Sequence, residues 1–375
     1  MRIVIAPDSF KESMSAAEAA AAIARGVHAV MPEADCVLVP MADGGEGTTD
    51  ALVAALGADL RRVRTVDALG RPIEATYGLT ADGLAIVEVA TAVGIGQIAP
   101  ADRDIMRATS LGVGDVVQDA LDAGATRLIV GLGGSVTTDG GAGLLQRLGA
   151  VLLAADGTVL PPTPEGLARL ARVDLRGLDP RVSGLQIDAA CDVTNPLLGP
   201  TGAAAVFGPQ KGATPEQVPV LDAALARLAD ALATAGAPDV RDRPGAGAAG
   251  GLGAAFLSLG GQMRRGVEVV AEAAGLDAHV RGADLVITGE GSIDGQTRFG
   301  KTPAGVAEVA QRHGVPVIAF AGRVAPDADV LLDHGFAAIV SIMRGPADLA
   351  TALAQGPANL EAAAATAMRL YRLSR

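Results

Sequence analysis

The first sixty residues repeat one order of elements, in which a short apolar strand leads through a polar loop into a helix. Residues 2–6 are rich in β-branched side chains, and residues 16–30 are good helix formers that Ser15 and Glu18 would cap as a reciprocal pair. Residues 36–39 predict a second strand, which a glycine-rich loop joins to a second helix. Strand–loop–helix units in succession are typical of a parallel sheet with helices on its faces.

The pattern changes after residue 60. Three strand-like runs between residues 62 and 89 are joined by short turns, which is antiparallel character. The α/β alternation returns near residue 281 and continues to the end of the chain. We therefore expect two α/β domains. Residues 1–60 and 281–375 would form a flavodoxin-like, doubly wound parallel sheet, and residues 61–280 would form an inserted α/β domain with a mixed sheet.

Charge and cysteine usage limit the function classes. The formal net charge of −12 argues against nonspecific binding to nucleic acid or to an anionic membrane. No apolar run approaches the roughly 18 residues of a membrane span, and the N-terminal apolar run is too short for a signal peptide. Cys36 and Cys191 form no metal-ligand or redox motif, which fits a reducing compartment. We expect a cytoplasmic protein without a nucleic-acid or membrane partner, and a homodimer stays an open alternative.

Lysine is rare in this chain, with three lysines against 27 arginines. Lys11, Lys211 and Lys301 each stand shortly before a predicted helix. The free N–H groups and the dipole at a helix N-terminus favour anions, so the three lysines mark candidate anion-binding loops. Solvated surface positions are the alternative interpretation of each one.

The loops 8–11, 43–47 and 289–301 follow predicted strands of the parallel sheet, and ligands of such sheets bind beyond the carboxyl ends of the strands. Residues 295–302 match the pattern G-x-x-x-x-G-K-[ST] of a P-loop. However, the preceding strand is predicted to end near Thr288, whereas a P-loop follows its strand directly. We therefore favour an anion-binding loop of another design, with a true P-loop as the alternative.

Acidic side chains are common in the glycine-rich and turn-like loops. They are Asp8, Asp43, Glu46, Asp139, Asp192, Glu290 and Asp294. Mg²⁺ takes one or two carboxylates together with phosphate oxygens, and an attacking hydroxyl needs a carboxylate base. The alternative is that these residues are ordinary turn residues and caps. Backbone N–H groups of residues 131–143 could cradle an oxyanion or form a structural turn, and Asn195 could bind a substrate hydroxyl or form a turn.

Six long motifs together resemble the type I glycerate kinase family. They are residues 3–13, 39–52, 131–150, 190–213, 245–255 and 283–307. The resemblance implies ATP- and Mg²⁺-dependent phosphorylation of D-glycerate, usually at the 2-hydroxyl. It also implies a flavodoxin-like domain interrupted by a second α/β domain, and a kinase that has no P-loop. A kinase for another small hydroxy acid and a non-catalytic ligand-binding protein are the alternatives.

The matching motifs contain three groups of expected site residues. The expected catalytic residues are Asp192, Asp294 and Lys11, with one of the two aspartates as the base. The expected substrate- and phosphate-binding residues are Lys211, Lys301, Ser135, Asp139, Asn195, Gly289 and Gly291. The expected metal ligands are Asp43 and Glu290. A nicotinamide-dependent dehydrogenase is disfavoured, because no G-x-G-x-x-G turn follows the first strand.

Overall fold

The computed structural model describes residues 1–298 and 300–373, and the chain divides into two compact units. The first unit consists of Met1–Asp43, Asp50–Ala58 and Arg265–Arg375, and the second of Gly44–Thr49 and Asp59–Arg264. Residues 265–280 therefore group with the first unit, whereas the sequence pattern assigned them to the insertion. Each unit has its own sheet and is described by itself.

The sheet of the first unit has five strands in the order β13-β12-β11-β1-β2, and every neighbouring pair is parallel. The strands are β1 (Arg2–Ile5), β2 (Asp35–Leu38), β11 (Leu285–Ile293), β12 (Val317–Val324) and β13 (Phe336–Ser341). Numbered within this unit the order is 2-1-3-4-5, which is the flavodoxin-like arrangement. The predicted doubly wound parallel sheet is confirmed.

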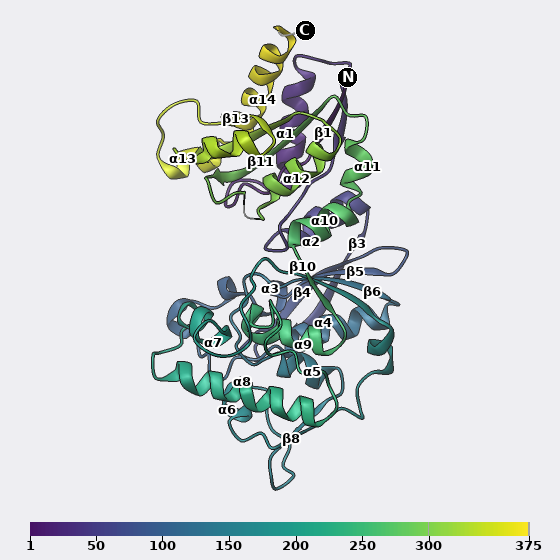
Figure 1. The fold of residues 1–375 in the computed structure, drawn as a ribbon, viewed down its shortest axis with the longest axis vertical. Helices are drawn as coiled ribbons and strands as arrows, with labels where there is room; N and C mark the ends of the chain where they lie inside the picture. Colours follow the sequence, from purple (N-terminus) through teal and green to yellow (C-terminus); the bar gives the residue numbers. More distant parts are fainter. Residues whose placement is uncertain (299, 374–375) are drawn as a thin grey trace. The chain divides into compact units, whose positions relative to one another are not determined.

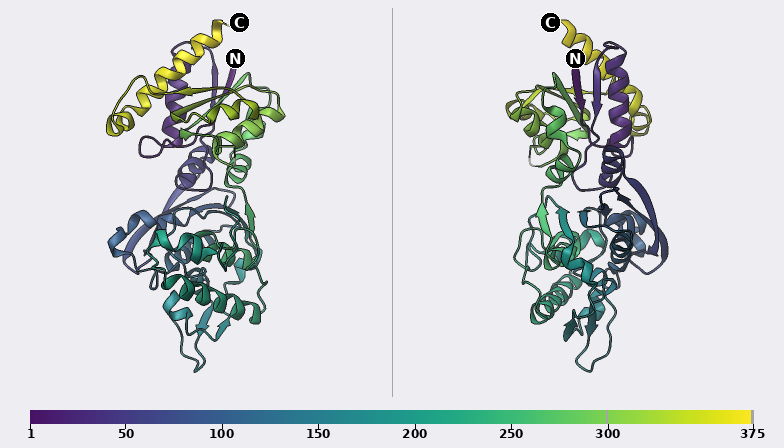
Figure 2. Two further views of the ribbon diagram at one scale, coloured as in Figure 1. Left: turned by 60° about the vertical axis from the view of Figure 1, so that its left-hand side comes forward. Right: turned by 90° about the vertical axis from the view of Figure 1, so that its right-hand side faces the viewer.

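Two helices lie side by side over one face of this sheet, as Figures 1 and 2 show: α1 (Ala16–His28) and α14 (Gly356–Leu373). The predicted cap of α1 is present. The Glu18 N–H donates to Ser15 Oγ at 3.2 Å, and the Ser15 N–H donates to Glu18 Oε2 at 2.8 Å. Gly26 permits the close approach of the helices, because a Cβ there would lie 2.3 Å from the Glu361 carbonyl oxygen.

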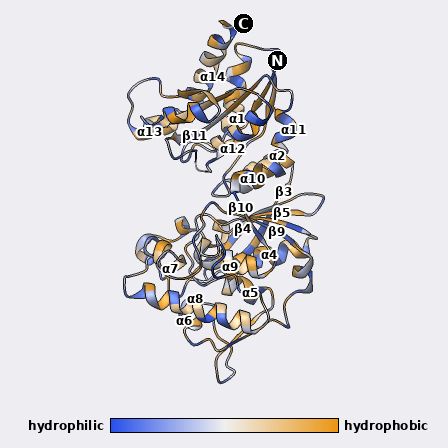
Figure 3. Ribbon diagram, viewed as in Figure 1, coloured by the Kyte–Doolittle hydropathy of each residue, from blue (hydrophilic) through white to orange (hydrophobic). Residues whose placement is uncertain are grey.

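The strands of this sheet supply the core of the first unit, and Figure 3 shows their hydrophobic character. Ile3 and Ile5 of β1, Ile287 of β11 and Phe320 of β12 are all completely buried. Removing such a side chain from water contributes about 1.5–3 kcal/mol each. Residues 3–5 of β1, 285–288 of β11 and 317–321 of β12 are buried throughout, because the centre of a parallel sheet is covered on both faces.

The second unit contains a six-stranded sheet in the order β10-β9-β6-β5-β4-β3 and a separate pair, β7-β8. Its strands are β3 (Asp59–Val66), β4 (Pro72–Leu79), β5 (Leu84–Glu88), β6 (Arg127–Gly131), β7 (Val151–Leu153), β8 (Arg172–Asp174), β9 (Gln186–Ala190) and β10 (Gln262–Arg264). β3, β4 and β5 pair antiparallel, while β5, β6, β9 and β10 pair parallel. The predicted mixed sheet is therefore confirmed.

The remaining α-helices are α2 (Thr48–Leu56), α3 (Ala90–Val93), α4 (Leu111–Asp122), α5 (Ala142–Arg147), α6 (Pro164–Leu167), α7 (Ala203–Phe207), α8 (Gln217–Thr234), α9 (Leu252–Ser258), α10 (Gly266–Ala273), α11 (Leu276–Val280), α12 (Thr302–Arg312) and α13 (Leu349–Ala354). Short 3-10 helices are η1 (Ile95–Gln97), η2 (Pro100–Asp102), η3 (Pro180–Gly184), η4 (Pro209–Lys211), η5 (Ala248–Gly251) and η6 (Ala328–His334). Within the described part of the chain, no helix combines the length and the apolar character needed to cross a bilayer.

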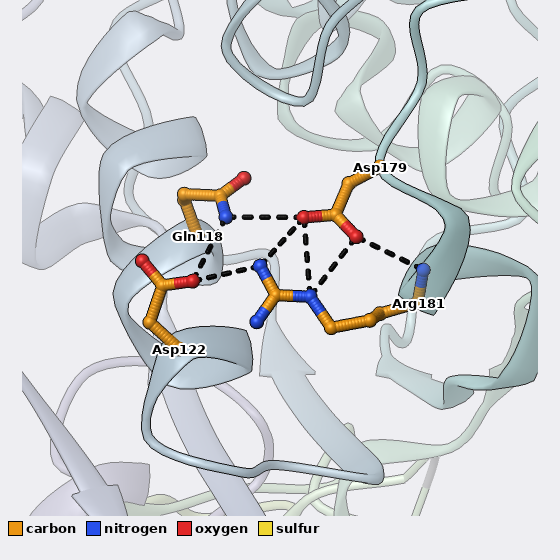
Figure 4. Close-up of polar contacts among 4 residues, drawn as sticks. All are labelled: Gln118, Asp122, Asp179 and Arg181. Carbon is orange, nitrogen blue, oxygen red and sulfur yellow. Dashed lines mark hydrogen bonds and ion pairs between the residues drawn. The ribbon is translucent and has the colours of Figure 1, made fainter.

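An ion network on the second unit joins α4 to η3 (Figure 4). The Arg181 guanidinium donates to Asp179 at 2.6 Å and to Asp122 at 2.7 Å, and Gln118 donates to both carboxylates at 3.2 Å. The Arg181 side chain is 44% exposed. Exposed ion pairs stabilise little, so this network contributes little to the free energy of unfolding.

Candidate functional site

The first unit gathers charged side chains at the carboxyl ends of β1 and β11. Asp8 follows β1, Glu290 lies within β11, and Lys301 stands directly before α12. β11 continues to Ile293, five residues beyond the predicted end at Thr288. The strand therefore ends just before the 295–302 loop, much closer than the sequence pattern suggested. Residue 299 of that loop lies outside the described residues.

The longer strand changes the setting of the two glycines that were expected to bind phosphate. Gly289 is paired with Phe320 of β12, and Gly291 lies between paired positions of the same two strands. Both are therefore strand residues, and neither belongs to a free loop. At Gly289 a Cβ would lie 2.4 Å from the Phe320 carbonyl oxygen, so glycine is required there for strand packing. Phosphate binding by these glycines stays a prediction.

Glu290 and Lys301 form the centre of this cluster. Lys301 Nζ lies 3.6 Å from Glu290 Oε1 and 3.9 Å from Asp294 Oδ1. The Thr297 hydroxyl donates to Glu290 Oε1 at 3.1 Å. Burial raises the pKa of Glu290 to about 7, although Lys301 and Thr297 act in the opposite direction. The cluster thus holds a carboxyl group poised near neutral pH beside a cation.

Asp294 shapes the loop that carries Lys301. Its Oδ1 accepts the N–H groups of Gln296 at 2.9 Å and Thr297 at 3.2 Å. The Asp294 N–H in turn donates to the Thr297 hydroxyl at 3.2 Å. This side chain–backbone turn fixes the loop between β11 and α12. A carboxylate already engaged in this way can still use its second oxygen as a base.

Asp8, one of the candidate loop carboxylates in the sequence but without a specific site role there, belongs to the same cluster. Its Oδ2 accepts the Thr302 hydroxyl at 2.5 Å, and its Oδ1 accepts the Ser9 N–H at 2.6 Å. Burial, followed by the negative charge of Asp43, raises the pKa of Asp8 to about 6. Asp8 also raises the pKa of Glu290. Asp8 therefore lies close enough to Asp43 to feel its charge, and close enough to Glu290 to affect it.

Lys11 differs from Lys301 in its surroundings. Its side chain is exposed, and in the described part of the chain no ion pair or hydrogen bond holds its ammonium group. The neighbouring Glu12 has a φ of 63°, a left-handed backbone conformation that a residue with a side chain rarely adopts. Lys11 can therefore reach for an anionic ligand without first breaking a contact.

A divalent cation fits the chemistry of this cluster. Mg²⁺ prefers carboxylate oxygens and completes its shell with water and phosphate oxygens, so one or two protein ligands suffice. Burial raises the pKa values of Asp8 and Glu290, with added repulsion of Asp8 by Asp43 and of Glu290 by Asp8, and a cation would relieve that cost. Among residues 1–298 and 300–373, no three acidic, histidine or cysteine side chains form a complete metal cage.

In the second unit, Lys211 lies at the end of η4 with only 2% of its surface exposed. Its Nζ donates to the Thr137 carbonyl oxygen at 2.7 Å and to Ser135 Oγ at 3.1 Å. Burial lowers the pKa of Lys211 to about 7, and the nearby Asp139 acts against that shift. This lysine is consequently an internal group that holds the glycine-rich loop 131–143.

Asp139 is also completely buried. Its Oδ2 accepts the N–H and the hydroxyl of Ser110, both at 2.7 Å, and the Gly143 N–H at 3.1 Å. Its Oδ1 accepts the Gly141 N–H at 3.1 Å. Burial raises its pKa, which these four bonds oppose. With so many donors already in place, the carboxylate is arranged to shape the loop.

The same loop contains buried hydroxyl groups. Ser135 is 5% exposed, and Thr137 and Thr138 are almost fully buried. In the described residues, the hydroxyls of Thr137 and Thr138 have no hydrogen-bond partner. Buried polar groups normally find partners, so these two are available to a bound ligand or to water.

The two remaining predicted residues follow β9. Asp192 is exposed and already takes part in a polar interaction. Asn195 is half-buried, and its Nδ2 donates to the Thr201 carbonyl oxygen at 2.8 Å. The Asn195 amide therefore stabilises its own loop while its oxygen can still accept a hydrogen bond.

Several residues with a part in these clusters were not singled out from the sequence. They are Ser110, Thr297 and Thr302. Ser110 stands at the N-cap position of α4, yet its hydroxyl donates to Asp139 and does not cap the helix. Their contacts join residues far apart in the chain or across a loop, and no local pattern reveals such pairs.

Comparison with known proteins identifies the family. A family model described as the glycerate kinase family matches residues 3–372. The chain belongs to the glycerate kinase family. It is 47% identical to a glycerate kinase of Bacillus subtilis over 351 residues, covering 93% of this chain and 92% of the relative. It is 46% identical to a glycerate 2-kinase of Escherichia coli, covering 92% of this chain and 91% of the relative.

A solved structure agrees with this family. The crystal structure of a protein assigned as glycerate kinase 2 from Salmonella typhimurium LT2 superposes with a TM-score of 0.91. The sequences are 46% identical, and the match covers 100% of this chain and 99% of the other. The predicted resemblance to glycerate kinases is confirmed, and with it the class of enzyme: a phosphotransferase that acts on an alcohol group.

Proposed function

We propose that this protein phosphorylates D-glycerate with ATP and Mg²⁺, and that 2-phosphoglycerate is the product. The observation that carries the proposal is the Glu290–Lys301 pair at the carboxyl end of β11, in a chain whose relatives are named glycerate kinases. Phosphoryl transfer depends on positioning and on neutralising phosphate oxygens, and this pair offers a fixed cation next to metal-binding carboxylates.

Lys301 and Lys11 would hold phosphate charge. The distances from Lys301 Nζ to its carboxylate partners, 3.6 and 3.9 Å, exceed those of tight charge-assisted hydrogen bonds. Its ammonium can therefore turn toward a phosphate oxygen without losing a strong bond. Lys11 is exposed and can approach the same kind of ligand as the loop adjusts.

Asp43 and Glu290 would hold Mg²⁺, with Asp8 as a third carboxylate close to both. When bound, Mg²⁺ supplies neutralisation of the charge on the transferred phosphoryl group. The chain's own contribution is to keep Glu290 ionised and oriented, which the Thr297 hydroxyl and Lys301 promote. The raised pKa values of Asp8 and Glu290 support a site that is completed by a cation.

The base that accepts the hydroxyl proton of glycerate would be Asp294 or Asp192. In the second unit, we assign Ser135 and Asn195 to the orientation of glycerate. Lys211 would act through Ser135, because its ammonium is buried against that hydroxyl. Thr137 and Thr138, whose hydroxyls have no hydrogen-bond partner among the described residues, would be further donors for glycerate oxygens.

Phosphorus NMR of the product tests the reaction and its position together. The purified protein would be incubated with ATP, MgCl₂ and D-glycerate, with L-glycerate and D-lactate as controls. The proposal predicts a new phosphomonoester signal that matches 2-phosphoglycerate. A 3-phosphoglycerate signal would contradict the position, and no new phosphoester would contradict the proposed function.

We further propose a cytoplasmic protein that binds small molecules and no nucleic acid. The net charge of −12 and the two free cysteines, Cys36 and Cys191, support this location and these partners. We also propose a homodimer in solution. Light scattering after gel filtration, with a mass near 75 kDa against 37.3 kDa for one chain, would test it.

A further inference from the structure

Glu88 is a buried carboxylate for which the proposed mechanism has no use. It ends β5, where it is paired with Gly131 of β6, and only 7% of its surface is exposed. Its Oε1 accepts the Thr49 N–H at 2.6 Å, and its Oε2 accepts the Gly47 N–H at 3.3 Å. A buried carboxylate is costly unless it is hydrogen-bonded, and here both oxygens receive backbone donors.

These contacts occur where two glycine-rich loops of the second unit touch. A Cβ on Gly131 would lie 2.6 Å from the Gly44 carbonyl oxygen, and a Cβ on Gly133 would lie 3.0 Å from the Gly45 Cα. The loop 44–49 therefore rests directly against the start of the loop 131–143. Neither position tolerates a larger residue without movement of a backbone segment.

The chemistry of the Glu88 contact is that of a helix cap. α2 begins at Thr48, so Gly47 stands at the position whose side chain usually accepts an N–H of the first turn. Gly47 has no side chain, and its φ of 93° favours glycine. Glu88 supplies the missing acceptor from another element, and its charge suits the positive end of the helix.

We propose that Glu88 is a positioning residue that fixes the loop 44–49, which directly follows Asp43 in the chain. This inference rests on the proposed function, because Asp43, an assigned Mg²⁺ ligand, directly precedes the loop. Glu88 touches neither substrate nor metal in this account. It acts through its hydrogen bonds with the backbone N–H groups of Gly47 and Thr49.

The test compares Glu88→Gln with Glu74→Gln. Glutamine keeps the size of Glu88 but presents an NH₂ group to a backbone donor and loses the charge. Glu74→Gln is the matched control, because it removes the same charge in the same unit. Glu74 forms an exposed ion pair with Arg62. Hydrogen exchange of peptides covering residues 44–52 would be measured together with the Mg²⁺ concentration for half-maximal activity.

Glu88→Gln is expected to speed amide exchange in residues 44–52, to raise the half-maximal Mg²⁺ concentration about tenfold and to lower kcat, with the KM for D-glycerate within twofold. Glu88→Asp, which keeps the charge but shortens the reach, should show the same changes more weakly if Glu88→Gln fails to fold. Unchanged exchange, or an equal kinetic effect in Glu74→Gln, would overturn the assignment. Exchange needs no substrate, so it tests the loop contact even if D-glycerate is not turned over, which would instead contradict the proposed function.

Discussion

Lys301 Nζ lies 3.6 Å from Glu290 Oε1, and two opposite effects on the protonation of Glu290 meet at this pair. The carboxyl group is held among buried surroundings that favour its neutral form, while the ammonium group and the Thr297 hydroxyl favour its ionised form. The balance leaves Glu290 with a pKa of about 7. A carboxylate in this state responds strongly to any cation that arrives beside it.

This balance predicts the pH dependence of activity. If ionised Glu290 binds Mg²⁺, kcat/KM at subsaturating Mg²⁺ should rise as the pH passes through about 7, and saturating Mg²⁺ should move that limb to lower pH. Glu290→Gln should abolish the limb and reduce kcat/KM about 100-fold. Glu308→Gln, an exposed change on α12, is the control. An unchanged acid limb in Glu290→Gln would show that another group titrates.

Lys211 predicts a pH dependence of stability. Burial lowers its pKa to about 7, against 10.5 for a free lysine, so the unfolded chain binds more protons than the folded one between these values. The free energy of unfolding should therefore rise with pH from about 7 to 10.5, and Lys211→Met should remove that part of the slope. Urea denaturation at several pH values measures it, with Lys11→Met as the exposed control. If the free energy of unfolding of Lys211→Met still rises with pH in this range, the lowered pKa of Lys211 is contradicted.

Asp139 predicts a large loss of stability. Its carboxylate accepts four hydrogen bonds from Ser110, Gly141 and Gly143, and an asparagine would direct its NH₂ group at some of these donors. Asp139→Asn should lower the free energy of unfolding by about 3 kcal/mol. Asp156→Asn changes an exposed turn and should leave the midpoint of urea unfolding nearly unchanged. Equal midpoints for the two variants would contradict the role of Asp139 in holding the loop.

The order of elements was predictable because it rests on local patterns. Alternation of strands and capped helices at both ends of the chain predicted the parallel sheet, and the tight turns after residue 60 predicted antiparallel pairing. The end of β11 was not predictable in the same way. Residues 289–292 read as a glycine-rich loop, yet pairing with β12 keeps them in the strand as far as Ile293. Partner strands decide such cases, because glycine disfavours a strand only weakly.

The candidate site also contains residues that local sequence predicts and contacts that it does not. Lys11, Asp43, Glu290 and Lys301 stand in motifs that local sequence marks, so they could be proposed in advance. Asp8 was a candidate by its loop, but its contact with Thr302, 294 positions later in the chain, has no local signal. The contact of Glu88 with Thr49 likewise has none. The burial of Lys211 was likewise unpredictable, because its surroundings come from the distant loop 131–143. Contacts between distant segments are set by the tertiary fold, which short-range spacing does not encode.

The most direct test of the central claim is ADP release by the wild type and by Lys301→Met, measured with ATP and Mg²⁺ in the presence and absence of D-glycerate. The account predicts ADP formation that depends on D-glycerate in the wild type and a loss of at least about 100-fold in kcat/KM in Lys301→Met, because a fixed cation at the transferred phosphoryl group is removed. No ADP above the glycerate-free control in the wild type, or near-normal kcat/KM in Lys301→Met, would contradict it.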